Sequence, residues 1–282
     1  MTIKVQVIGT STFFGVPDGL LPLKDGKFDC QVDECQTEHD QQYKTLKLTP
    51  EQDRGTAMER LIECAGRTCY DSYGRGRNSS DYHKHILESG HGSVLEHAFI
   101  SFFISGISRG CSHELVRHRA GVAISQRSTR FVDESESEWA LHPLLEKELE
   151  SVVADSPLED VIITEDLEDS INEGVNKAKA IYRDIVTYLQ GRGVPRKQAR
   201  GAARGLLGNA LSTELIWSAN VRAIRNFLEQ RANEGADAEI RLLANAIYKE
   251  AQVHCPSYFS DYEETPCSDG IGFSLATPYR KV

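Results

Sequence analysis

The stretch Val94-Leu-Glu-His-Ala-Phe-Ile-Ser-Phe-Phe-Ile-Ser105 gives the clearest indication of the fold. Alternate residues of an extended chain point to the same side of a sheet. One side would carry Ala98, Ile100, Phe102 and Ile104. The other would carry Phe99, Ser101, Phe103 and Ser105. Because both sides are largely apolar, the pattern predicts a strand that lies inside a sheet.

Other segments predict further elements around this strand. Ile3, Val5 and Val7 alternate with polar residues and indicate a half-buried strand. Acidic residues 133–170 indicate a strand or loop followed by short helices with solvated faces. Helices are predicted at about 56–70, from a Ser108 cap to about Arg119, from about Leu167 to Leu189, at about 196–207 and at about 218–252.

The order of these segments predicts the organisation of the chain. Residues from about 10 to 55 are irregular and indicate a long loop or insertion, and a polar tail follows about residue 260. Since no repeat and no linker divides the sequence, we expect one α/β domain over residues 1–282, with helices packed on a sheet.

Composition limits the function. The 282 residues are 40% hydrophobic, and their formal charge of −10 opposes a general nucleic-acid-binding surface. No apolar run is long enough for a membrane span, and the N-terminus lacks a signal-peptide core. Seven scattered cysteines, an odd number, suit a reducing compartment, so we expect a cytoplasmic protein. Cys30 and Cys35 have no second pair to complete a zinc site, and we expect no metal.

The densest concentration of chemistry lies between Arg109 and Arg130. This segment holds Glu114, Arg117, His118, Arg119, Gln126, Arg127, Ser128 and Arg130. Converging guanidinium groups bind phosphate through strong bidentate hydrogen bonds, which indicates a mono- or diphosphate pocket. An ion-pair network with Glu134, Glu136 and Glu138, or a plain basic surface, would explain the same residues.

A second polar set occurs at Asn220, Arg222, Asn226 and Arg231. On one helix, Asn220 and Arg231 would be about three turns apart and would share a hydrogen-bonding face. A solvated helix face is the alternative. Among the histidines at 83, 85, 91, 97, 113 and 118, His83 and His85 are a possible ligand pair, but no H-E-x-x-H motif and no carboxylate at matching spacing joins them. No hydrolase, P-loop or Rossmann motif is present.

Four motifs together resemble the flavin-dependent thymidylate synthases. They are Ser93-Val-Leu-Glu-His97, Gly106-Ile-Ser-Arg109, His113-Glu-Leu-Val-Arg-His-Arg119 and Ser125-Gln-Arg-Ser-Thr-Arg-Phe131. The triplet Arg117-His118-Arg119, followed after eight residues by Ser128, matches the signature of that family. Matches continue at 197–204, 220–231 and 236–240, so the resemblance covers about 58–132 and 193–260.

The resemblance implies a fold and an activity. The fold would be a single α/β domain with a twisted, mainly antiparallel sheet flanked by helices, assembled as a homotetramer with shared active sites. The activity would be reductive methylation of C5 of dUMP to dTMP, with methylenetetrahydrofolate as carbon donor and NADPH-reduced FAD as hydride donor. Methylation of another uracil nucleotide such as UMP, or flavin or nucleotide binding without catalysis, are the alternatives.

The resemblance also implies roles for individual residues. FAD would be held by His97, Arg117, His118, Arg119, Asn220, Arg222 and Asn226, some of them from another chain. The nucleotide would be held by Arg109, Glu114, Gln126, Arg127, Ser128, Arg130, Arg204 and Arg231. Arg231 and Ser128 are the catalytic candidates: Arg231 would stabilise negative charge on the pyrimidine. Ser128 has no base placed to deprotonate it, so we expect it to bind.

Four features depart from the usual pattern of that family. Gly235, expected inside a helix, stands where a histidine near the flavin is usual, and Gly208 replaces a proline. Phe99 occupies a position that often carries a small hydroxyl residue, and the N-terminal segment is long. These departures concern the flavin contacts and the identity of the nucleotide.

Overall fold

A computed structural model describes residues 2–13, 55–72, 77–152 and 156–282. The predicted insertion at about 10–55 lies almost wholly outside these residues. The helices are α1 (Ala57–Tyr70), α2 (Ser79–Glu88), α3 (Arg109–Leu115), α4 (Pro143–Ser151), α5 (Leu158–Gly191), α6 (Arg196–Ala203), α7 (Val221–Arg231) and α8 (Ala238–His254). The strands are β1 (Lys4–Thr10), β2 (Phe99–Ser108), β3 (Val122–Gln126), β4 (Ser212–Asn220), β5 (Glu263–Pro266) and β6 (Phe273–Ala276). Short 3₁₀ helices occupy η2 (Gly92–His97), η3 (Arg204–Leu206) and η4 (Pro256–Tyr258).

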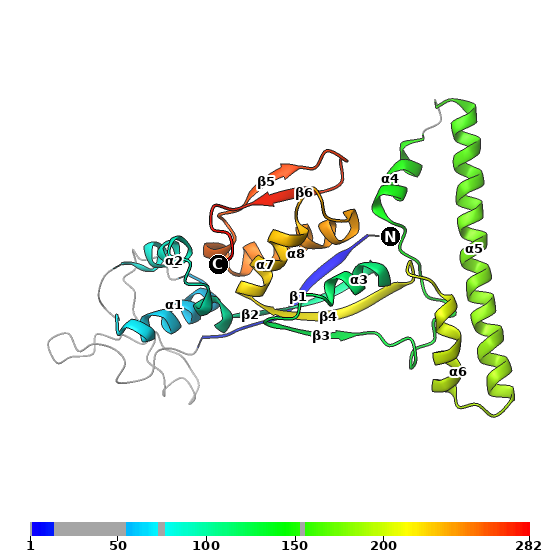
Figure 1. The fold of residues 1–282 in the computed structure, drawn as a ribbon, viewed down its shortest axis with the longest axis horizontal. Coiled ribbons are helices and arrows are strands. Elements are labelled where there is room, and N and C mark those ends of the chain that lie inside the picture. The colour runs from blue at the N-terminus through cyan, green and yellow to red at the C-terminus, as the bar shows by residue number, and fades with distance from the viewer. Residues whose placement is uncertain (1, 14–54, 73–76, 153–155) are drawn as a thin grey trace, which may run out of the picture.

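The main sheet has the order β1-β2-β4-β3, and every neighbouring pair is antiparallel. Helices α3, α7 and α8 lie on one side of it (Figure 1). Ile100, Phe102 and Ile104 of β2 face these helices and are fully buried, while Phe99 and Ile216 are exposed on the opposite side. This arrangement confirms the predicted α/β class, with an antiparallel sheet flanked by helices.

The central strand begins at Phe99, so the predicted start at Val94 was wrong. Gly92–His97 forms the 3₁₀ helix η2 instead. Val94 and Leu95 are both buried in the core although they are consecutive. A strand would point consecutive side chains to opposite faces, whereas a helical turn lets both reach the same core.

The single helix predicted at 218–252 was also wrong. Leu215, Trp217 and Ala219 are buried at alternate positions, so this segment begins as strand β4. Asn220 is the N-cap of α7, and its side chain accepts a hydrogen bond from the Ala223 amide at 2.8 Å. Gly235 lies in the turn between α7 and α8, so the expected helix penalty does not apply to it.

Two further boundaries differ from the prediction. Helix α3 ends at Leu115 rather than near Arg119, so the Arg-His-Arg triplet follows the helix. The acidic segment contains α4 and then α5, one helix of 34 residues that begins at Leu158, well before the predicted start at Leu167. Glu159 and Asp160 in the first turn of α5 favour this early start, because acidic groups stabilise a helix N-terminus.

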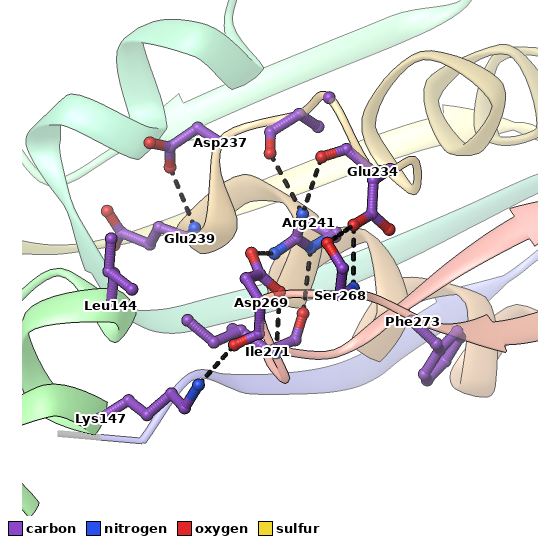
Figure 2. Close-up of polar contacts among 12 residues, drawn as sticks. Leu144, Lys147, Glu234, Asp237, Glu239, Arg241, Ser268, Asp269, Ile271 and Phe273 are labelled. Atoms are coloured by element: carbon purple, nitrogen blue, oxygen red, sulfur yellow. Dashed lines mark hydrogen bonds and ion pairs between the residues drawn. The ribbon is translucent and has the colours of Figure 1, made fainter. Parts of the chain in front are cut away.

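The segment after residue 260 is more than the predicted polar tail. It forms the β5–β6 hairpin, whose Ile271 and Leu275 are buried. Arg241 of α8 is buried beneath it and donates to the Ile271 carbonyl at 3.1 Å (Figure 2). The same guanidinium donates to the Glu234 carbonyl at 3.2 Å and pairs with Asp269, so it joins the hairpin to the α7–α8 turn.

A second buried arginine holds α7 against the C-terminal segment. Arg225 makes a bidentate ion pair with Asp261, with N–O distances of 2.9 and 3.0 Å. It also donates to the Tyr258 carbonyl at 2.5 Å and lies over the Tyr262 ring. Burial lowers the pKa of Arg225, but the hydrogen bond and charge of Asp261 outweigh burial and leave this pKa raised.

Removing one partner of this pair should destabilise the fold strongly. Asp261→Asn should cost about 3–5 kcal/mol of unfolding free energy, because it leaves a buried guanidinium without its counter-charge. Glu88→Gln, which breaks the exposed Lys84–Glu88 pair, should cost less than about 1 kcal/mol. Urea denaturation measures both, and equal losses would contradict the structural role of Arg225.

Candidate functional site

The site is built around the start of α3. Ser108 is the N-cap of this helix, and its hydroxyl accepts from the Cys111 amide at 2.9 Å. The same hydroxyl, and the Ser108 amide, each donate to the buried carboxylate of Glu239 at 2.6 Å. This contact fixes α3 to α8 and so sets where Arg109 and Glu114 project.

Arg231, at the end of α7, joins Glu114 and His118 in one cluster. Its Nη1 donates to the Glu114 carboxylate at 2.7 Å, and its Nε donates to His118 Nε2 at 3.0 Å. The His118 ring packs edge-on against Phe227. Burial, and then the positive charge of Arg231, lower the pKa of His118 to about 4. His118 is therefore neutral near pH 7, as an acceptor of the Arg231 hydrogen bond must be.

Arg109, Gln126 and Arg204 form a second cluster. Arg109 Nη1 lies 3.5 Å from the Thr213 hydroxyl, and the Gln126 amide nitrogen lies 3.2 Å from it. Burial lowers the pKa of Arg109; Glu134 opposes this effect, while the nearby charge of Arg204 adds to it. Arg204 donates to the Thr129 hydroxyl at 3.3 Å, and its charge acts on Arg109, so both guanidinium groups are candidates for binding an anionic ligand.

Arg127 belongs to the ion-pair network that was the alternative at the sequence level. Its guanidinium lies 3.5 Å from the buried carboxylate of Glu134 and 3.5 Å from Glu214. Ser128 follows it and accepts a long hydrogen bond from the Arg130 amide at 3.4 Å. Glu134 and Glu214 are thus the ion-pair partners of Arg127, whereas Arg130 is exposed and lies beside Gly201.

Asn220, Arg222 and Asn226 line a pocket of about 400 Å³. Ala120 and Gly121, directly after the Arg-His-Arg triplet, also line it. Gly121 has a φ of 67°, and a Cβ there would lie 2.4 Å from the Asn220 amide, so only glycine fits. The amide and guanidinium donors of the pocket suit part of an anionic cofactor, and Glu96 holds Arg222 at 2.5 Å.

Asn220, the N-cap of α7, and Arg231, its last residue, lie about three helical turns apart and on the same side of the helix, as predicted. They stand at opposite ends of α7, separated by about 16 Å of helix axis. Each therefore joins a different cluster. His97, Arg117 and Arg119 are exposed, and their side chains make no hydrogen bond or ion pair with any described residue.

Three residues of the site escaped the sequence prediction. Ser112 and Thr213 contact Gln126, and Glu239 fixes the start of α3. Recognising the alternation of β4 would have pointed to Thr213.

Gly208 has a φ of 68°, which proline cannot adopt, so the backbone here differs from one that a proline would allow.

The described residues lack the features of a metal centre and of a membrane span. They contain no group of three or more His, Cys, Asp or Glu side chains placed to bind a metal ion. Their helices include none with the length and hydropathy of a membrane span. The cysteines they contain are all free.

Comparisons with known proteins identify the family of the chain. The family model described as thymidylate synthase complementing protein matches residues 53–257. A flavin-dependent thymidylate synthase of Mycobacterium marinum is 39% identical over 223 residues, which cover 75% of this chain and 82% of the relative. The enzyme of that name from Mycobacterium tuberculosis is 37% identical over 233 residues, 79% of this chain and 85% of the relative. The matched residues 53–257 include strands β2, β3 and β4, both clusters and the pocket of Asn220, and the relatives are covered over most of their length, so the chain belongs to the family of the flavin-dependent thymidylate synthases.

Proposed function

We propose that the protein methylates C5 of dUMP to give dTMP, with methylenetetrahydrofolate as carbon donor and NADPH-reduced FAD as hydride donor. The observation that carries the proposal is the cluster of Arg231, Glu114 and His118 in a chain of this family. The names of its relatives, all thymidylate synthases, favour dUMP over UMP as the nucleotide.

Arg231 is suited to the chemical step. Forming a carbon–carbon bond at C5 builds negative charge on the uracil ring, and a fixed guanidinium stabilises such charge. Glu114 and His118 hold Nη1 and Nε, and no described residue bonds to Nη2. Nη2 therefore remains for the pyrimidine. Because His118 is neutral, it orients Arg231 without adding a competing charge.

The second cluster is suited to the nucleotide. Arg109 and Arg204 would hold the phosphate, since their adjacent guanidinium groups offer charge-assisted hydrogen bonds. Gln126, Ser128 and Arg130 would contact the rest of the nucleotide. Arg127 would support them, because its ion pairs with Glu134 and Glu214 tie the loop after β3 to β4.

The pocket of Asn220, Arg222 and Asn226 is suited to part of FAD. When bound, FAD supplies the hydride that completes the methyl group. The exposed side chains of His97, Arg117 and Arg119 would add cationic and aromatic contacts to it. His118 would join them as part of the Arg-His-Arg triplet.

We also propose a cytoplasmic homotetramer with shared active sites. Helix α5 supports assembly, because Ile163, Leu167, Ile181 and Tyr188 are exposed on it. At 3.6 residues per turn these four side chains fall within about 60° of one another, so they form one apolar stripe. Exposed stripes of this kind mark protein–protein contacts. The free thiols of the described cysteines suit a reducing cytoplasm.

Product analysis tests the function. Purified protein supplied with FAD, NADPH and methylenetetrahydrofolate should convert dUMP to dTMP and should methylate UMP more slowly. Faster methylation of UMP than of dUMP would show that UMP is the substrate. Nucleotide binding without any methylated product would instead support a binding protein that has lost catalysis.

Arg231→Lys should damage the chemical step more than nucleotide binding. Lysine keeps the charge but loses the planar fork, and the stabilisation is needed only as the bond forms. We expect kcat to fall by about 10²–10³ with little change in the affinity for dUMP. Rapid mixing should show flavin reduction by NADPH at nearly the normal rate, and loss of that half-reaction alone would contradict the role.

Leu167→Glu should weaken the assembly, because it places a charge in the apolar stripe of α5. Light scattering should report a smaller average mass at working concentration. Asn172→Glu is the matched control, since it adds the same charge on the opposite side of the helix. If both variants keep the wild-type mass, the stripe lies outside the subunit interface.

A further inference from the structure

We infer that Ser112 and Thr213 are positioning residues that fix the side-chain amide of Gln126, so that its carbonyl oxygen accepts a hydrogen bond from the 3′-hydroxyl of the nucleotide sugar. This inference rests on the proposed function, because it takes a uracil nucleotide as the ligand. It assigns a role in substrate selection to two buried hydroxyl groups of α3 and β4.

Ser112 determines which end of the Gln126 amide faces inward. Its hydroxyl is fully buried and donates its single proton to the Arg109 carbonyl at 2.9 Å. Toward Gln126, which lies 2.8 Å away, the hydroxyl can therefore only accept. The group of Gln126 that faces Ser112 must be its NH₂.

The same NH₂ group of Gln126 also contacts Thr213. Its buried hydroxyl accepts from Gln126 Nε2 at 3.2 Å. With both amide hydrogens directed at hydroxyl groups, Oε1 of Gln126 is the atom left for a ligand. Within the described part of the chain no group donates to this oxygen, and it is absent from the buried polar atoms that lack a partner. Solvent or a ligand can therefore reach it.

Arg109 indicates which part of the nucleotide meets Gln126. Its Nη1 lies 3.5 Å from the same Thr213 hydroxyl, so the guanidinium and the amide are neighbours. With the 5′-phosphate on Arg109, the nearest hydrogen-bond donor along the nucleotide is the 3′-hydroxyl, a few bonds away. The uracil N3–H lies beyond the sugar. Gln126 therefore contacts the sugar, and Arg231 can contact the uracil base.

Calorimetric titration of the FAD-loaded protein tests this assignment. The two ligands are dUMP and 2′,3′-dideoxyuridine 5′-monophosphate, which lacks only the 3′-hydroxyl. The wild-type protein should bind dUMP about fivefold to tenfold more tightly, the effect of one neutral hydrogen bond. Thr213→Val should reduce this preference to less than about twofold, and Thr213→Ser should restore it. In steady state, Thr213→Val should raise KM for dUMP more than it lowers kcat.

The possible outcomes separate this inference from the proposed function. Equal binding of both nucleotides by the wild-type protein overturns the inference alone, and binding of neither overturns both. If Thr213→Val weakens both ligands equally and keeps their ratio, Thr213 has only a structural role and the inference fails. If Thr213→Val does not fold, Ser112→Ala carries the same expectation, because it removes the nearer acceptor of the amide.

Discussion

The carboxylate of Glu239 lies buried against Ser108, where β2 ends and α3 begins, and accepts two hydrogen bonds there. An ionised carboxylate is costly to bury unless it is well hydrogen-bonded, so the two elements are held in one arrangement. Arg109, Ser112 and Glu114 all project from the short helix that this contact positions. The cluster of Arg109 and Gln126 and the cluster of Arg231, Glu114 and His118 therefore both depend on it.

Arginines serve two different purposes in this molecule. Arg225 and Arg241 are buried, and both of their terminal nitrogens donate to protein groups, so they hold the C-terminal segment in place. Arg109 and Arg231 are only partly buried and leave a terminal nitrogen without a partner among the described residues. A buried guanidinium whose two terminal nitrogens both donate to protein groups stabilises the fold, whereas one with a terminal nitrogen left over can still bind a ligand.

The hydroxyl and imidazole groups of the site act through these arginines. His118 is kept neutral by burial and by Arg231, and it can then accept the hydrogen bond that orients the guanidinium. Thr213 similarly accepts from both Arg109 and Gln126. His118 and Thr213 are thus neutral acceptors that help to orient the two guanidinium groups, while Glu114 is the charged partner of Arg231.

The sequence by itself determined the local features whose signal lies in a few neighbouring residues. The alternation of Ile100, Phe102 and Ile104 predicted a central strand, and the Ser108 cap predicted the start of α3. The Arg-His-Arg triplet with its spaced serine predicted the family. Hydrophobic periodicity and helix capping depend on residues close together in the chain, so they can be recognised before the fold is known.

Only the tertiary structure decided where continuous patterns break and which distant groups meet. Residues 218–252 resembled one helix, but residues 218–220 complete strand β4 by pairing with β2, and a turn separates α7 from α8. The partners of Arg231 are 113 and 117 residues away in the chain, and Thr213 meets Gln126 across 87 residues. Such contacts arise when sheet and helices pack around a common core, and no local pattern encodes that packing.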